Sequence, residues 1–234
     1  MGIRTVLGWC ALIIGAIQVS AAPAGVFTHG PATCHAVAFT FDLCPVSRGS
    51  GFDAPLVKFL VDHQVHATFF VSGKWIATHD AEMRQLIAQP FFEIGTHGQV
   101  HAHLPTLTTD AQSAEIHGPV ATLAKRYSVT TTLFRPPYGE YNDDSVRQAE
   151  AQGQTFVTWS IVSGDPDPNL SAERIVADVL GRARNGSIVI FHANGRGWHT
   201  AEVVPAVYKA LVETKHFAAE TVTELRGCQG QHAR

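Results

Sequence analysis

Short apolar runs of strand length alternate with helical patterns along most of this 234-residue chain. The expected strands lie at residues 37–42, 67–71, 92–95, 133–135, 155–159 and 188–192, with a weaker one near 217–221. The expected helices lie at residues 54–63, 81–88, 110–127, 143–152, 171–183 and 201–213. Seven short strands separated by helices predict an α/β fold. No internal repeat, linker or low-complexity stretch interrupts the pattern, so we expect one domain.

Several of these helices begin with residues that favour helix initiation. Ser171 and Thr200 stand at N-cap positions, where a hydroxyl can accept a hydrogen bond from a free backbone N–H group. Asp110 and Asp143 place negative charge in a first helical turn, which the helix dipole favours. These residues support the helix boundaries given above.

The composition is that of an ordinary globular protein, with 45% hydrophobic and 16% charged residues. A chain of this length can bury one well-packed core. The formal net charge is −3, and the sequence contains no run of lysines or arginines. Charge therefore gives no indication of a nucleic-acid partner.

The N-terminus has the pattern of an export signal. Residues 1–4 supply a positive charge, residues 6–19 are almost entirely apolar, and residues 19–21 end in the small side chains that a signal peptidase accepts. A membrane anchor is the alternative, but the apolar run is shorter than the roughly 20 residues that span a bilayer. We therefore expect a signal peptide over residues 1–21 and a single domain over 22–234. The mature protein is expected to be periplasmic or extracellular, without stable membrane insertion.

Three cysteines follow the expected signal: Cys34, Cys44 and Cys228. Disulfides persist in exported proteins. Cys34 and Cys44 flank the expected strand at 37–42, which at about 3.3 Å per residue holds them beyond the roughly 7 Å limit for bridged Cα atoms. The first and last elements of a closed or nearly closed barrel lie side by side. Cys34 and Cys228 are therefore the favoured pair, and their bridge would join both ends of the domain.

A pair of histidines, His97 and His101, stands where the expected strand at 92–95 gives way to a loop. If the chain turns helically after Gly98, both rings fall on one face and can bind one metal ion. The alternative is that these are solvated or hydrogen-bonded histidines at a strand end.

Three other expected strands also end in chemically reactive side chains. Asp42 ends the first strand, Arg135 the fourth and His192 the sixth. Catalytic side chains of α/β folds gather at the carboxyl ends of the strands. We therefore expect these residues and the histidine pair to converge on one face of the molecule.

Five short motifs occur in a fixed order along the chain. They are TFD at 40–42, HGQVH at 97–101, RPPYG at 135–139, Trp159 with Asp165 six residues later, and IVIFH at 188–192. Together they resemble the motifs of the NodB-homology polysaccharide deacetylases, carbohydrate esterase family 4, over nearly all of the expected mature chain. The resemblance implies a distorted (β/α) barrel of about seven strands and a bound divalent metal ion, often zinc. It also implies removal of acetyl groups from N-acetylated sugars.

The resemblance assigns four residues to activation of the attacking water. Asp42 matches the general base, and Arg135 matches the residue that holds the base in place. His97 and His101 match the two metal-binding histidines. A metal ion lowers the pKa of a water molecule and polarises the carbonyl, while a carboxylate accepts the proton. An arginine beside that carboxylate lowers its pKa and fixes it through a bidentate contact.

The resemblance assigns three further residues to the leaving group and the oxyanion. His192 matches the general acid, and Asp165 matches the carboxylate that orients it and favours its charged form. An amine leaves poorly unless it is protonated, and a histidine of near-neutral pKa can donate that proton. The main-chain N–H of Tyr138 matches a donor that helps to stabilise the tetrahedral oxyanion.

The first motif departs from the family at Leu43. The family normally has a second aspartate there, which is the third protein ligand of the metal, and leucine cannot coordinate an ion. A catalytic zinc site typically has three protein ligands and one open position. The thiolate of Cys44 can supply the third ligand, as can Asp53 or Asp42, although Asp42 would then be lost as the base. The remaining alternative is that the metal has been lost.

A second departure is Pro166, because the family often has an aromatic residue after the aspartate matched by Asp165. Trp198, on the loop after the expected general acid, can compensate by offering an aromatic face to a sugar ring. Its alternative role is that of a partly buried packing residue.

The sequence thus predicts an exported, metal-dependent hydrolase that removes acetyl groups from a glycan such as peptidoglycan or a chitin-like polymer. The first alternative is a catalytically impaired, NodB-like glycan-binding protein that has lost a metal ligand. Hydrolysis of a small amide or acetyl ester is a third.

Overall fold

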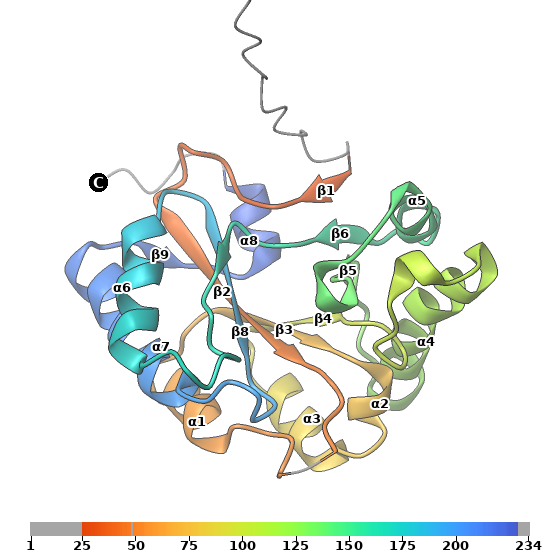
Figure 1. Ribbon diagram of the computed structural model, residues 1–234, viewed down its shortest axis with the longest axis horizontal. Coiled ribbons are helices and arrows are strands. Elements are labelled where there is room, and N and C mark those ends of the chain that lie inside the picture. The colour runs from red at the N-terminus through yellow and green to blue at the C-terminus, as the bar shows by residue number, and fades with distance from the viewer. Residues whose placement is uncertain (1–24, 48, 229–234) are drawn as a thin grey trace, which may run out of the picture.

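A computed structural model describes residues 25–47 and 49–228; the expected signal peptide lies outside these residues. All strands in this part of the chain pair in parallel within one curled sheet, in the order β1-β6-β5-β4-β3-β2-β8-β7, with β9 added beside β2 (Figure 1). The strands are β1 (Val26–Phe27), β2 (Ala36–Leu43), β3 (Ala67–Val71), β4 (Phe92–Thr96), β5 (Leu133–Phe134), β6 (Thr155–Val157), β7 (Ile161–Val162), β8 (Ser187–His192) and β9 (Ala218–Ala219).

Helices surround the curled sheet, giving the distorted (β/α) barrel that was expected (Figure 1). They are α1 (Ala54–Asp62), α2 (Gly73–Ile76), α3 (Asp80–Ile87), α4 (Thr109–Tyr127), α5 (Asp143–Ala151), α6 (Ala172–Arg182), α7 (Thr200–Tyr208) and α8 (Val222–Gly227). Two 3₁₀ turns, Leu104–Thr106 and Pro137–Gly139, and a π-helical segment, Lys209–Thr214, complete the assignment. No helix in the described part of the chain is long and apolar enough to cross a bilayer.

The two edges of the curled sheet are connected by the irregular segment between β6 and β7, and not by a continuous strand. Thr158 N–H donates to the carbonyl of Phe27 at 3.0 Å, and Ser160 N–H donates to the carbonyl of Ile188 at 3.1 Å. The chain thus passes from the β1 side of the sheet to β8 within three residues. This crossing places the loop that follows β7 beside the carboxyl end of β8.

Strand β2 lies at the centre of the sheet, and all of its residues are buried. Successive side chains of a strand point to opposite faces. Phe41 and Leu43 belong to the large apolar cluster under the helices, where the Phe41 ring lies 5.2 Å from that of Phe69. Asp42 and Cys44 therefore share the other face, which lines a pocket at the carboxyl end of the sheet.

Each of the seven expected strands is present, whereas β1 and β7 were not expected from the sequence. Both have only two residues, which is too short to show a periodic pattern. The short helices α2 and α8 were missed for the same reason. The helix expected at 201–213 changes from α to π geometry at Lys209.

The expected N-cap is confirmed for α6, where the Ser171 hydroxyl accepts from the Arg174 N–H. For α7 the expectation was wrong, because the N-cap position is His199 and its side chain makes no capping bond. The hydroxyl of Thr200 instead donates to the carboxylate of Asp165 at 2.7 Å. The charged carboxylate of Asp165 is a stronger acceptor, so the Thr200 hydroxyl bonds to it and does not cap its own helix.

The expected disulfide between Cys34 and Cys228 is confirmed, with a Cα–Cα distance of 6.0 Å. It joins the residues before β2 to the end of α8 across 194 positions of sequence. A crosslink over so long a loop removes much of the conformational entropy of the unfolded chain. Both half-cystines thereby hold the last helix against the first long strand.

We expect the double variant Cys34→Ala/Cys228→Ala to lose about 2–5 kcal/mol of unfolding free energy, because the unfolded chain regains its loop entropy. Urea denaturation of the oxidised wild type and the variant measures this loss. Reduced wild type serves as a matched control and should unfold at the midpoint of the variant. An unchanged midpoint in both would show that the bridge contributes no stability.

Candidate active site

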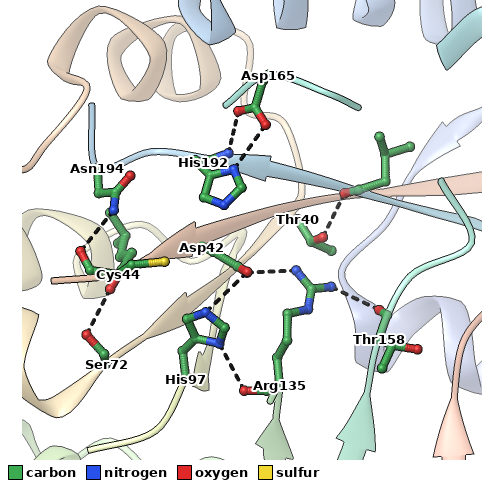
Figure 2. A network of polar contacts seen from close by, with 12 residues as sticks. Thr40, Asp42, Cys44, Ser72, His97, Arg135, Thr158, Asp165, His192 and Asn194 are labelled. Atoms are coloured by element: carbon green, nitrogen blue, oxygen red, sulfur yellow. Dashed lines mark hydrogen bonds and ion pairs between the residues drawn. The ribbon is translucent and has the colours of Figure 1, made fainter. Parts of the chain in front are cut away.

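Four strands of the sheet bring the expected site residues to one rim. Asp42 and His192 are direct neighbours in the parallel register of β2 and β8. His97 follows β4, and Arg135 follows β5. Figure 2 shows Asp42 between His97 and Arg135, with His192 across from it. Asp42, His97 and His192 line a pocket of about 190 Å³, whose other lining residues include Cys44, His101, Tyr138, Trp159, Asp165 and Arg196. Arg135 lies behind Asp42 and is fully buried. A larger hollow of about 500 Å³, near Phe91 and Thr223, contains none of them.

Arg135 contacts the expected base directly. Its Nη1 lies 2.9 Å from Asp42 Oδ1, and its Nη2 donates to the carbonyl of Thr158 at 3.1 Å (Figure 2). The expected bidentate contact is therefore wrong, because the two ends of the guanidinium serve different acceptors. Burial raises the pKa of Asp42, but its interactions with His97 and Arg135 more than offset burial, so the pKa lies below its usual value. The base is ionised at neutral pH.

His97 is held in the tautomer that a metal ligand needs. Its Nδ1 lies 2.9 Å from the carbonyl of Arg135, which can only accept, so Nδ1 carries the proton. The free Nε2 faces Asp42, whose Oδ2 lies 3.4 Å away. Burial lowers the pKa of His97, and burial is also the main reason that the pKa of His101 is lowered to about 3. Both rings are thus neutral, which is the ligand form.

The loop from His97 to His101 is not helical, so the expected helical turn is wrong. Gly98 and His101 both have left-handed backbones, with φ values of 75° and 65°. The buried carboxylate of Glu115 holds this loop by accepting from the N–H groups of Val100 and Ala102 at 2.9–3.1 Å. Glu115 was missed by the sequence analysis, and it fixes the position of the second histidine.

Cys44 completes a set of three metal-ligand atoms. Its thiol and one nitrogen each of His97 and His101 all lie within 4.8 Å of one another. Cys44 is a free, buried cysteine, and burial raises the pKa of its thiol. Two neutral imidazoles and a sulfur suit zinc, which holds a coordinating thiol in its thiolate form. The donor set therefore fits the expected ion.

The two other ligand candidates do not join that set. The carboxylate of Asp53 caps α1, where it accepts from Leu56 N–H at 3.1 Å. Asp42 is held by Arg135. Leu43 points into the apolar core and has no exposed surface. Among the described residues, the structure thus favours Cys44 over Asp53 and Asp42.

His192, which is partly buried, and the buried Asp165 form a pair on the other side of the pocket. His192 Nδ1 lies 3.0 Å from Asp165 Oδ1, and the His192 N–H donates to Oδ2 at 2.7 Å (Figure 2). The hydroxyls of Ser163 and Thr200 also donate to this carboxylate. Burial lowers the pKa of His192, but the hydrogen bond and charge of Asp165 outweigh burial and raise the pKa above its usual value. Asp165 thus favours the protonated form of His192.

Aromatic side chains form the mouth of the pocket. Tyr138 has a left-handed backbone (φ 61°) and a half-exposed ring that lies parallel to the ring of His103, with centroids 4.0 Å apart. The side chain of Trp198 is 66% exposed, which excludes the packing role considered for it. Trp159 and Pro166 line the pocket itself. These flat surfaces suit the apolar face of a sugar ring.

Comparison with known proteins identifies the family. The family model described as polysaccharide deacetylase matches residues 29–157. The chain belongs to the polysaccharide deacetylase family. A peptidoglycan-N-acetylglucosamine deacetylase of Bacillus cereus is 30% identical over 194 residues, which cover 83% of this chain and 68% of the relative. A chitooligosaccharide deacetylase of Bradyrhizobium is 32% identical over 139 residues, 57% of this chain and 60% of the relative. The protein YlxY of Bacillus subtilis is 28% identical over 186 residues, and the chain spans 56% of its length.

Solved structures of polysaccharide deacetylases share the fold. A peptidoglycan N-acetylglucosamine deacetylase superposes with a TM-score of 0.79 at 24% identity, covering 88% of this chain and 94% of that one. A CE4 family pseudoenzyme from Bacillus anthracis superposes with a TM-score of 0.77 at 21% identity, covering 88% of this chain and 69% of that one. At these identities the likeness establishes the distorted barrel and no more.

Proposed function

We propose that this polysaccharide deacetylase family member is an exported hydrolase that removes the acetyl group from the amide nitrogen of an N-acetylated glycan. It would act with a divalent metal ion, zinc by the chemistry of the ligands, held by Cys44, His97 and His101. The observation that carries the proposal is that the carboxylate of Asp42, three metal-ligand atoms and the imidazole of His192 line the same pocket. Relatives named as deacetylases of peptidoglycan and chitooligosaccharide support a glycan substrate.

Attack on the acetamide requires an activated water. When bound, a zinc ion lowers the pKa of a water molecule and polarises the carbonyl oxygen. Asp42 accepts the proton of the attacking water, and Arg135 keeps this carboxylate ionised and correctly oriented. The main-chain N–H of Tyr138 is assigned to the oxyanion that forms on the carbonyl oxygen.

Collapse of the tetrahedral intermediate requires protonation of the amine. His192 donates this proton, and Asp165 stabilises the charged imidazolium before the transfer. Since Asp42 and His192 stand side by side on adjacent strands, one acetamide can reach both groups. The products are acetate and a free amino sugar.

If His192 is the general acid, kcat should fall as the pH rises. Asp42 has a lowered pKa and remains ionised throughout, whereas the donor form of His192 is lost as the pH rises above its raised pKa. Asp165→Asn removes the charge that favours the protonated form. We therefore expect kcat to fall at a pH about 1–2 units lower than in the wild type. Thr200→Val is the control, because it removes a hydroxyl from Asp165 without changing its charge, and it should shift this fall less. A fall of kcat at the same pH in Asp165→Asn and the wild type would contradict the assignment.

Export is supported by two observations of different kinds. The sequence begins with a signal-like segment, and the described residues contain the Cys34–Cys228 disulfide, which suits an oxidising compartment. Detection of the processed protein outside the cytoplasm, with its new N-terminus near residue 22, tests this part of the proposal. Unprocessed protein in the cytoplasm would exclude it.

A second candidate function is glycan binding without turnover. It is favoured by Leu43, which replaces the usual acidic ligand, and by the structural likeness to a protein described as a pseudoenzyme. Zinc-loaded protein incubated with N-acetylglucosamine oligosaccharides and peptidoglycan distinguishes the two functions. We expect acetate release from at least one glycan. Retention of glycan without acetate would select the binding function, and acetate release from small acetyl esters alone would select a small-molecule hydrolase.

A further inference from the structure

The loop that follows β8 presents a cation that the mechanism above does not use. Arg196 lines the catalytic pocket. It also lines a second hollow, of about 280 Å³, together with Pro45, Val46 and Ser47. A ligand that fills the catalytic pocket and extends into this hollow must therefore pass Arg196.

The guanidinium of Arg196 makes no hydrogen bond or ion pair with the residues that the structure describes. Every other arginine within residues 25–47 and 49–228 donates a guanidinium hydrogen bond to a carboxylate, a hydroxyl or a carbonyl. An arginine presents a planar fork of donors that matches a carboxylate or phosphate. The N–H donors of the Arg196 guanidinium are therefore available to a ligand.

The charge of Arg196 also acts on the expected general acid. Burial and this charge both lower the pKa of His192, although the hydrogen bond and charge of Asp165 outweigh them. A carboxylate beside the guanidinium would offset the repulsion between Arg196 and a protonated His192.

The loop is tied to the catalytic residues on both sides of Arg196. Asn194 accepts from Arg196 N–H at 3.2 Å and donates to the carbonyl of Cys44 at 2.9 Å. Trp198 N–H donates to the carbonyl of Asp165 at 3.0 Å. Gly197 packs so closely that an added Cβ would clash with Asp165. The backbone that carries Arg196 is therefore fixed beside the catalytic residues.

We propose that Arg196 is a specificity-determining residue that binds a carboxylate carried by the sugar whose acetamido group is cleaved. The preferred substrate is then an acidic N-acetylated sugar. This proposal rests on the proposed function, because it concerns the substrate of the same pocket. Arg196 would thus favour such sugars over neutral N-acetylglucosamine, which has no carboxylate to pair with the guanidinium.

The test uses two oligosaccharides that differ in one group. One carries a muramic-type N-acetylated sugar with a free carboxylate, and in the other this carboxylate is converted to the amide. We expect Arg196→Gln to lower kcat/KM for the acid about 10–100-fold, mainly through KM, and for the amide less than about twofold. Arg174→Gln, which removes an exposed arginine of α6, is the matched control and should change neither value.

Three outcomes would overturn the proposal. Equal losses of kcat/KM for the acid and the amide would show that Arg196 does not bind the carboxylate. Loss of bound zinc from Arg196→Gln would assign the guanidinium to the thiolate of Cys44 instead. Tighter binding of a phosphorylated N-acetylated sugar than of the carboxylate would assign the site to a phosphate.

The proposal can fail separately from the proposed function. Binding of the acid and the amide is measured by calorimetry to Asp42→Asn protein, with and without Arg196→Gln. We expect a preference for the acid of about 10-fold or more that disappears in the double variant. This result would establish the carboxylate subsite even if the wild type released no acetate, whereas equal binding of acid and amide would exclude it.

Discussion

Replacing Asp42 with asparagine is expected to abolish acetate release without removing the metal ion. The amide cannot accept the proton of the attacking water, and loss of a general base costs about 10²–10⁴ in rate. Asparagine keeps the size of the side chain and lies outside the set of ligand atoms from Cys44, His97 and His101. Acetate release and bound zinc, measured on the same preparation, provide the two readouts.

This variant also leaves Arg135 buried with its charge unpaired. Removing one partner of a buried ion pair costs about 3–5 kcal/mol, so thermal unfolding must show that Asp42→Asn is folded at the assay temperature. Asp53→Asn is the matched control, because it removes a nearby carboxylate that only caps α1, and asparagine caps equally well. It should keep full activity. Equal activity of Asp42→Asn and wild type would exclude Asp42 as the base.

The second large effect is expected at Cys44. Cys44→Ala removes one of three ligand atoms and should weaken zinc binding by more than about 100-fold, since even changes to residues behind metal ligands cost 10–100-fold. Cobalt-substituted wild type should show a sulfur-to-cobalt charge-transfer absorption, which Cys44→Ser should lack. Both readouts are independent of turnover.

A second variant tests whether an acidic residue at position 43 could replace Cys44 as the ligand. Leu43→Asp restores the acidic residue usual in the family, but Leu43 is fully buried in the apolar cluster under the helices. We expect Leu43→Asp/Cys44→Ala to lose stability without recovering zinc affinity. Unchanged zinc affinity in Cys44→Ala would instead show that the two histidines bind the ion with another group.

The ends of the expected strands located the site more reliably than local motif geometry. The strands that end at Asp42 and His192 have clear apolar patterns, and the structure pairs these two residues in parallel register. Side-chain alternation along β2 and the residue after it, which the sequence analysis did not use, places Cys44 on the face of Asp42 and Leu43 on the other. The helical turn expected between His97 and His101 was wrong, because their spacing does not distinguish a helix from a loop with left-handed residues.

Contacts between distant segments account for what the sequence analysis missed. Glu115 lies in α4 and holds the loop before His101, while Thr200 turns from its own helix to Asp165. A signal for Glu115 was present, since it falls in the buried stripe of α4 with Ile116 and Leu123. A carboxylate in such a stripe needs a buried partner. No local signal of this kind marks Thr200, whose acceptor is 35 residues away.

The most direct test of the account is acetate release from an N-acetylated glycan as zinc is titrated into metal-free wild-type protein. The account predicts that the rate rises in proportion to bound zinc and saturates at one ion per chain. A protein that binds one zinc ion and releases no acetate from any N-acetylated glycan would contradict it, as would full activity in the absence of the ion.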